Sequence, residues 1–567
     1  MKKTKSKFEK IVKILCAMLL AAIQIVGYSF SKQNNWNLVI KDGRISGKAI
    51  VIWAIGSILV YACISFIYLI LDRMMDTRDI KEDGKITYKQ LVLLALVILL
   101  CWLPYMILFY PGCANPDVQD QLGQFFHNET MCWTRKYVNL VDPQHSYWNN
   151  HHPVFHTLVL GIFAQFGKQI GHISVGIFLL TLIQMILMAG IFAYILLYLK
   201  KMNFNNVVLG VVFVFYAFWP LAPLTTMSLC KDTLFTICIL IATIMLFHLL
   251  KEPEMFWKKK RNMVGLIVIF ILQGLFRNNG LYLLLVAFPF ILLLGKGFRK
   301  RIFISFLIPI LFLGVFIPKV VFNITQIAPG SEKEMLSVPL QQTARLLKEH
   351  ENDVTQKDKK IIETTMCPGS DYHILIERYD PRSSDPVKAL YNIKQTSGQR
   401  KAYLKVWAKY LFRYPSVYIQ AAINNSYEYL YYERYGEGTM YYNGITVDKE
   451  LFLGVDNTSS SEKWRLKLRD TLFLIKENPY IGWILNIGFY MNLFIILIVY
   501  GLQRKKYATV GAFSLIILNI GINFIGPKVY MRYAFFFIVS IPLLTPYSSI
   551  LVTTIITKKT KGKEEQG

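Results

Sequence analysis

The chain has 567 residues, of which 54% are hydrophobic and 17% charged, a balance that excludes a soluble protein of this length. Aromatic residues make up 14% and long apolar runs recur, so the composition also excludes an intrinsically disordered chain. Lys and Arg number 63 against 36 Asp and Glu, a formal net charge of +27. In a membrane protein such an excess lies in short cytoplasmic loops and sets orientation, so it does not indicate a nucleic-acid partner.

Apolar runs without a charged residue recur along the chain, and about twelve of them predict helices that cross a bilayer, whose core takes roughly 20 helical residues. The first run lacks a clear small-x-small cleavage site, so we interpret it as an uncleaved anchor and not as a signal peptide. The predicted crossings are 14–30, 50–71, 91–110, 173–199, 207–224, 234–250, 264–276, 281–294, 302–318, 481–502, 509–525 and 534–556. A shorter run, 154–166, spans only about 20 Å as a helix and is predicted to be a juxtamembrane helix on the outer face.

Basic clusters predict which end of each crossing is cytoplasmic, because Lys and Arg in short loops stay inside. These clusters lie at 2–13, 73–89, 200–201, 258–261, 296–301, 504–506 and 558–563. Alternation between them puts both termini in the cytoplasm and the following connections outside: 31–49, 111–172, 225–233, 277–280, 324–478 and 526–533. We therefore expect a multi-pass protein of the plasma membrane.

The predicted fold is an all-α polytopic membrane protein with five parts. An N-terminal transmembrane hairpin (1–90) precedes a transmembrane core (91–323), which carries the large outer loop 111–172. A mainly helical extracytoplasmic domain (324–478) follows, with helices expected at 337–349 and 399–412. C-terminal transmembrane helices (479–556) and a basic cytoplasmic tail (557–567) complete the chain.

Polar and charged residues gather at the predicted outer ends of the crossings. The set consists of Asp117, Asp120, Gln121, His151, His152, Lys231, Asp232, Arg277, Asn278, Asn279, Arg532 and Tyr533. Charged groups at such depths are costly and are usually functional or paired. Carboxylates, three cations from separate helices and a histidine pair suit the binding of a phosphorylated lipid headgroup and the activation of a hydroxyl nucleophile. A polyprenyl carrier fits, because its tail stays in the bilayer while its phosphate lies at the interface.

Five short motifs resemble a bacterial branch of the glycosyltransferase-C superfamily. They are Pro-Gly-x4-Asp at 111–117, His-His-Pro at 151–153, Lys-Asp at 231–232, Arg-Asn-Asn-Gly at 277–280 and Arg-Tyr at 532–533. The resemblance implies an enzyme of the bacterial plasma membrane that transfers a sugar from a polyprenyl-phosphate donor to a cell-envelope glycan, lipid or protein, usually with inversion. The general base of that superfamily maps onto Asp117. The commoner motif has paired acids, whereas Val118 follows Asp117 here and the next acid is Asp120, which leaves the base and any metal requirement open.

Residues of the first outer loop also have structural interpretations. Asp117 could form an Asx-turn after Pro116, and Asp120 could hydrogen-bond locally or bind the acceptor instead of serving as the base. His151 and His152 could bind a divalent metal ion with Asp117, or could cap the helix that follows. Cys113 and Cys132 could form a disulfide or remain as free thiols.

The later polar residues have alternatives as well. Lys231 and Arg277 could snorkel to the interface, but their polar neighbours favour phosphate contact. Arg532 is similar, while Tyr533 could belong to an aromatic belt. The aromatic-rich segment 427–442 could stack on sugars or form the seam between the outer domain and the membrane part.

The predicted function is glycosyl transfer, in which Asp117 deprotonates the acceptor hydroxyl and three cations hold the donor phosphate. Those cations are Lys231, Arg277 and Arg532, and further substrate contacts are expected from Gln121, His152, Asp232, Asn278, Asn279 and Tyr533. The alternatives are a flippase or transporter for lipid-linked sugars and a non-catalytic scaffold for envelope assembly. The sequence has no clear internal repeat, and its polar groups lie at the outer edge and not at the midplane, which favours the enzyme.

Overall fold

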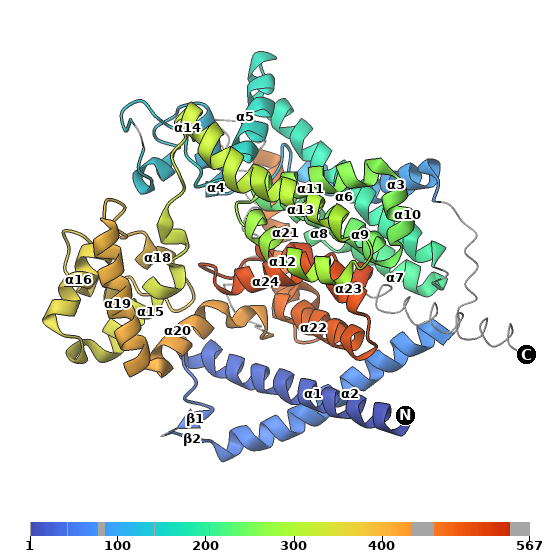
Figure 1. Ribbon diagram of the computed structural model, residues 1–567, viewed down its shortest axis with the longest axis horizontal. Helices are drawn as coiled ribbons and strands as arrows, with labels where there is room; N and C mark the ends of the chain where they lie inside the picture. Colours follow the sequence, from blue (N-terminus) through green and yellow to red (C-terminus); the bar gives the residue numbers. More distant parts are fainter. Residues whose placement is uncertain are drawn as a thin grey trace, which may run out of the picture.

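The computed structural model describes residues 2–41, 43–76, 86–140, 142–202, 204–432 and 459–544. In this part of the chain the fold is helical, apart from a two-stranded hairpin of β1 (Ile40–Lys41) and β2 (Arg44–Ile45) (Figure 1). The end of the predicted crossing 534–556, the tail 557–567, most of the segment 427–442 and most of the basic loop 73–89 lie outside the described residues.

Six of the described helices are long and apolar enough to cross a membrane, which confirms a helical membrane protein. They cover Lys7–Gln33, Gly47–Arg73, Tyr88–Leu108, Ile173–Lys201, Lys231–Lys251 and Arg299–Thr325. Shorter apolar helices cover Asn206–Phe218, Gly280–Leu294, Ile487–Gln503, Ser514–Phe524 and Met531–Leu544. Eleven of the twelve predicted crossings overlap one of these helices, the last of them only as far as Leu544, and the run 264–276 lies in the helix Lys260–Phe276. The shorter helices leave the number of crossings open.

The N-terminal hairpin consists of α1 (Lys2–Gln33) and α2 (Gly47–Asp76), which pack side by side (Figure 1). Helix α2 leaves almost all of its apolar surface uncovered, including Ile52 and Ile58. A soluble domain rarely exposes so large an apolar surface, so this surface is suited to contact with lipid.

The helices of the membrane core surround α9 (Lys231–Lys251), which is the most buried of the six long apolar helices. The helices packed against it are α6 (Ile173–Lys201), α10 (Pro253–Lys258), α11 (Lys260–Phe276), α23 (Tyr507–Ala512), α24 (Ser514–Phe524) and α25 (Met531–Ile538). The same hydrophobic core includes α3 (Tyr88–Leu108), α7 (Asn206–Phe218), α12 (Gly280–Leu294), α13 (Arg299–Leu311) and α22 (Ile487–Gln503), and α5 (Val154–Gln169) packs on α6. Because α9 lies at the centre, the residues at its first turn face several other elements at once.

Two predicted crossings are interrupted in the structure. The run 207–224 breaks after α7, and a short helix α8 (Leu221–Thr226) follows. Pro220 explains this break, because proline has no N–H for the helix and disfavours helical geometry at the residue before it. The run 509–525 is divided at Phe513 into α23 and α24. Predictions of single, continuous helices were wrong for these two runs.

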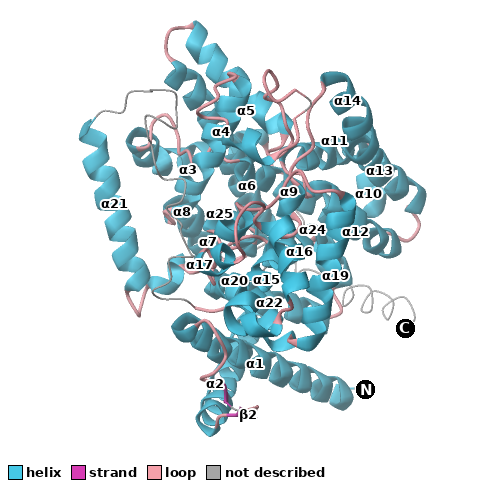
Figure 2. Ribbon diagram, turned by 90° about the vertical axis from the view of Figure 1, so that its left-hand side faces the viewer, coloured by secondary structure: helices cyan, strands magenta, loops and turns pink. Residues whose placement is uncertain are grey.

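The segment after the membrane core folds around a hydrophobic core of its own. It comprises α15 (Ser337–His350), α16 (Gln356–Met366), α17 (His373–Glu377), α18 (Asp385–Lys388), α19 (Ser397–Arg413) and α20 (Pro415–Ser426). The helices predicted at 337–349 and 399–412 are therefore confirmed. Thr396 and Gln399 form a capping box that starts α19. Helix α21 (Ser459–Glu477) runs along the side of the molecule (Figure 2).

The molecule has two chemically different ends. At one end Arg504 forms ion pairs with Glu9 at 3.1 Å and with Asp72 at 2.7 Å, which joins the basic ends of α1, α2 and α22. At the other end lie the β1–β2 hairpin and the domain formed by α15 to α20, opposite the N-terminus (Figure 1). The domain is attached there by main-chain hydrogen bonds, including Ser384 N to Pro527 O at 3.0 Å.

Candidate functional site

The loop that begins at Pro111 is held against the start of α9 by main-chain hydrogen bonds. Cys113 donates its N–H to the Met227 carbonyl at 3.0 Å and accepts from the Leu229 N–H at 2.9 Å. Two residues later, the Asn115 side chain caps α4 (Pro116–Phe125) by accepting from the Val118 N–H at 3.2 Å. This arrangement places Asp117, in the first turn of α4, beside the first turn of α9.

Asp117 lies between two cations that come from different helices. Its Oδ2 atom is 3.2 Å from Arg532 Nη1 and 3.5 Å from Lys231 Nζ. Burial favours a higher pKa for Asp117, but Arg532 and Lys231 outweigh it and hold this pKa well below its usual range. Asp117 is therefore ionised, and it is Asn115 that makes the capping bond at this turn.

The two cations occupy unusual positions, because Lys231 is the first residue of α9 and Arg532 is the second residue of α25. A helix N-terminus already carries a partial positive charge, which makes a cation there unfavourable unless an anion is near. The first turn of α4 meets them, so its N-terminus adds a third positive dipole end. The site is thus built to hold negative charge, and in the structure Asp117 supplies part of that charge.

A second ion-pair system adjoins the first. Arg277 Nη1 lies 3.1 Å from Asp232 Oδ1, and Arg532 Nε lies 4.0 Å from Asp232 Oδ2. The Arg277 guanidinium also covers the ring of Tyr533, at 5.1 Å from its centroid, and the Tyr533 hydroxyl is 3.1 Å from Arg532 Nη2. Five of the residues singled out in the sequence, from α9, α11 and α25, therefore form one continuous network with Asp117.

A third group lies behind Lys231. His152 Nδ1 is 2.9 Å from Lys231 Nζ, and His152 Nε2 is 3.6 Å from Asp120 Oδ2. Asp120 is fully buried and accepts hydrogen bonds from the main-chain N–H and the hydroxyl of Thr134, both at 2.7 Å. Burial raises the pKa of Asp120 to about 7, although the Thr134 bonds oppose this effect. The two carboxylates of the loop thus have pKa values displaced in opposite directions, a common arrangement in catalytic sites.

Some of the residues singled out in the sequence do not join the network. Gln121 is buried and donates to His156 at 3.0 Å and to Thr157 at 2.9 Å, so it belongs to the packing of α4 on α5. Asn278 is exposed and donates to the Asn150 carbonyl at 3.0 Å, while Asn279 precedes α12 without a side-chain cap bond. Of these three residues, Asn278 connects two loops near the network.

The loop cysteines and histidines also have defined places. Cys113 and Cys132 are both buried and free, so the loop is not held by a disulfide between them. Within the described ranges, no group of three His, Cys, Asp or Glu side chains is arranged to hold a metal ion. His152 Nδ1 is already occupied by Lys231, which removes one of the expected donors. The described residues therefore do not fit the metal site considered for His151, His152 and Asp117.

Comparison with known proteins gives one result. Residues 1–549 match a family described as a family of unknown function (DUF6020). The chain belongs to this family. No curated protein and no solved structure shows a significant match.

The Arg532 guanidinium also lies 5.1 Å from the centre of the Tyr530 ring. Sequence reasoning missed two residues that touch the network. Cys230 lies 3.2 Å from Arg532 Nη1, and because it precedes Lys231 in the sequence, adjacency was the available signal. Thr134, which binds Asp120, had none, because its approach depends on the return of the loop from Cys132 to α5.

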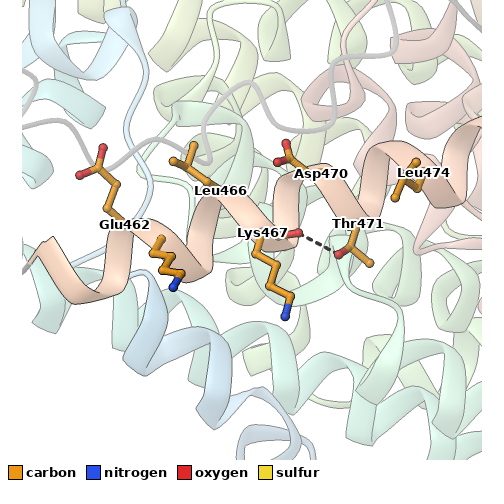
Figure 3. Close-up of a pocket in the computed structure, with 7 residues that line it drawn as sticks. Glu462, Leu466, Lys467, Asp470, Thr471 and Leu474 are labelled. Carbon is orange, nitrogen blue, oxygen red and sulfur yellow. Dashed lines mark hydrogen bonds between the residues drawn. The ribbon is translucent and has the colours of Figure 1, made fainter.

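Two hollows in the described surface lie away from the charged network. One, of about 670 Å³, follows α21 and is lined by Glu462, Lys463, Leu466, Lys467, Asp470, Thr471 and Leu474 (Figure 3). The other, of about 340 Å³, lies between α15, α19, α20 and the end of α24. The described residues that line the first hollow all belong to α21, and neither hollow is lined by a residue of the charged network.

Proposed function

We propose that the protein is a membrane glycosyltransferase of the glycosyltransferase-C type. It transfers a sugar from a polyprenyl-phosphate donor to an acceptor hydroxyl of the cell envelope, at the outer face of a bacterial plasma membrane. In this proposal the chain crosses the membrane about twelve times. Both termini are cytoplasmic, and the domain formed by α15 to α20 lies outside.

The observation that carries the proposal is the placement of Asp117 between Lys231 and Arg532. The side chains of Asp117, Lys231 and Arg532 are 19%, 16% and 13% exposed, so a ligand can reach them. Cations and helix N-termini directed at one point suit a phosphate or diphosphate group. A polyprenyl phosphate brings that charge to this depth, because its tail remains in the bilayer.

The same geometry suggests how the base is controlled. Paired with two cations, Asp117 is a weak base. When the donor phosphate binds, Lys231 and Arg532 turn toward its oxygens, and the Asp117 carboxylate becomes more basic. Asp117 then takes the proton of the acceptor hydroxyl while the acceptor oxygen bonds to the anomeric carbon. The bond from that carbon to the phosphate oxygen breaks, its electron pair stays on the phosphate, and the two cations stabilise the added charge.

Arg277 has a different role in this scheme. Its partner Asp232 is almost completely buried and lies 3.1 Å away, so Arg277 is already engaged in an ion pair before a ligand binds. We expect Arg277 to hold Asp232 and Tyr533 in place beside Arg532, and to contact the phosphate at most at its edge.

The test is incubation of the purified protein with polyprenyl-phosphate sugar labelled in the sugar, with envelope acceptors added. Transfer of the label or release of carrier phosphate supports the proposal, and Asp117→Asn should abolish it. Asp142→Asn is the matched control, because Asp142 is an exposed carboxylate of the same loop outside the network. Uptake of the labelled lipid without bond cleavage would instead support a flippase.

Sidedness is tested separately by thiol labelling in intact cells. In a background without the native cysteines, Asp371→Cys should react with an impermeant reagent, while Arg261→Cys should react only after permeabilisation. Both positions are exposed and lie on opposite sides in the proposed topology. The reverse pattern would contradict an outer location for the network.

A further inference from the structure

His152 is buried behind the network and has no exposed surface through which a ligand could touch it. Its exposed fraction is 2%, and it lies between Lys231 on one side and Asp120 on the other. It does not cap α5, because Pro153 occupies the cap position and no side-chain cap bond is present. A buried imidazole between an ammonium and a carboxylate calls for an explanation other than helix capping.

The partners of His152 define which ring nitrogen carries the proton. An ammonium group can only donate, so Nδ1, at 2.9 Å from Lys231 Nζ, must accept. The proton of the neutral ring is then on Nε2, which lies 3.6 Å from Asp120 Oδ2, an electrostatic contact longer than a hydrogen bond. Burial and the neighbouring Lys231 ammonium lower the pKa of His152 well below its usual value, in agreement with a neutral ring.

Asp120 is itself held in one orientation. Its Oδ1 accepts from the Thr134 N–H and its Oδ2 accepts from the Thr134 hydroxyl. The carboxylate therefore cannot rotate away from His152 without losing two hydrogen bonds. From Thr134 to Asp120, His152 and Lys231, each group restricts the orientation of the next.

We infer that His152 is a positioning residue, which directs the Lys231 ammonium toward Asp117 and the donor phosphate, and that Asp120 fixes the tautomer this requires. One of the three Lys231 N–H bonds points to His152, and another faces Asp117 at 3.5 Å. The third remains for an incoming anion. The identity of that anion rests on the proposed function, whereas the contacts from Thr134 through Asp120 and His152 to Lys231 do not.

Two substitutions separate this role from simple packing. His152→Phe keeps a planar ring but removes the acceptor for Lys231, whereas His152→Gln keeps an acceptor oxygen. Asp120→Asn keeps the shape, and because its oxygen must still accept from the Thr134 N–H, it presents an N–H₂ group to His152. The imidazole proton is then favoured on Nδ1, where it opposes the Lys231 ammonium.

The assay is binding of polyprenyl phosphate to the full-length protein in lipid nanodiscs, with the donor KM and kcat measured in parallel. His152→Phe and Asp120→Asn should each weaken binding about 10-fold and raise the donor KM. The kcat should also fall, because a displaced Lys231 no longer stabilises the charge on the leaving phosphate. His152→Gln should bind nearly as wild type does. In the His152→Phe background, Asp120→Asn should have no further effect, because the chain is already broken.

Lys231→Ala distinguishes failure of this inference from failure of the proposed function. If Lys231→Ala binds polyprenyl phosphate as wild type does, the phosphate site itself is wrong. If Lys231→Ala weakens binding while His152→Phe and Asp120→Asn do not, the positioning role is overturned. Additive losses in the double variant would also overturn it. Should His152→Phe fail to fold, Asp120→Asn and the near-normal His152→Gln variant carry the same test.

Discussion

Replacing Asp117 by Asn is expected to change phosphate binding and sugar transfer in opposite directions. In the structure the Asp117 carboxylate is paired with the two cations that would hold the donor phosphate. It lies 3.2 Å from Arg532 and 3.5 Å from Lys231. A ligand phosphate must therefore compete with Asp117 for Arg532 and Lys231. Asparagine removes the competing charge and, at the same time, removes the base.

The size of the effect follows from these distances. At an effective dielectric constant of about 20, each pair is attracted by roughly 5 kcal/mol before solvation is considered. Partial exposure lets water replace much of that attraction, so a coupling of about 1–3 kcal/mol between Asp117 and the phosphate is reasonable. Asp117→Asn should then bind polyprenyl phosphate about 5- to 150-fold more tightly. Loss of a general base should slow transfer by about 10²- to 10⁴-fold.

Both quantities are measured on one preparation, by titration with polyprenyl phosphate and by single-turnover transfer from labelled donor. Asp142→Asn should leave both unchanged. If Asp117→Asn bound the carrier more weakly than wild type, the carboxylate would not compete with phosphate, and the assignment of the two cations would be refuted. Normal transfer in this variant would refute its role as base.

Three further predictions concern stability and specificity. Because burial raises the pKa of Asp120 to about 7, the stability it contributes when protonated is lost as the pH rises from about 4 to 7. The melting temperature of Asp120→Asn minus that of wild type should therefore be more positive at pH 8 than at pH 5. The same difference at both pH values would contradict the raised pKa of Asp120. Arg532→Lys should raise the donor KM about 10-fold, because an ammonium cannot reach several partners in a fixed plane; Arg504→Lys, at the opposite end, should not. A Cβ at Gly176 would overlap the Phe163 carbonyl oxygen of α5, so Gly176→Ala should cost about 1–3 kcal/mol of unfolding free energy in detergent, whereas Gly190→Ala in the same helix has open space and should cost little.

The contrast between the two ends of the molecule could be predicted from the sequence. Apolar runs must be helical in a bilayer, since their main-chain polar groups have no water to bind, so the sequence predicted where most of the apolar helices lie. The helix in the run 207–224 is interrupted at Pro220, because proline has no N–H to donate within the helix. The position of this proline in the sequence could have predicted the break. The convergence of Asp117, Lys231, Arg277 and Arg532 was also expected, because alternation put them at the same membrane face.

The sequence determined which charged residues lie at the ends of the apolar helices, because composition and the spacing of apolar runs depend only on local chain properties. The pairing of those charges depended on tertiary structure. Lys231, Arg532 and Arg277 were predicted from the sequence to be free to bind phosphate. In the structure they are paired with Asp117 and Asp232, which come from different helices. Asp120 is linked to Lys231 through His152 only because the loop returns past Thr134. Electrostatic energies change over a few ångströms, a scale that is fixed by packing and not by residue order.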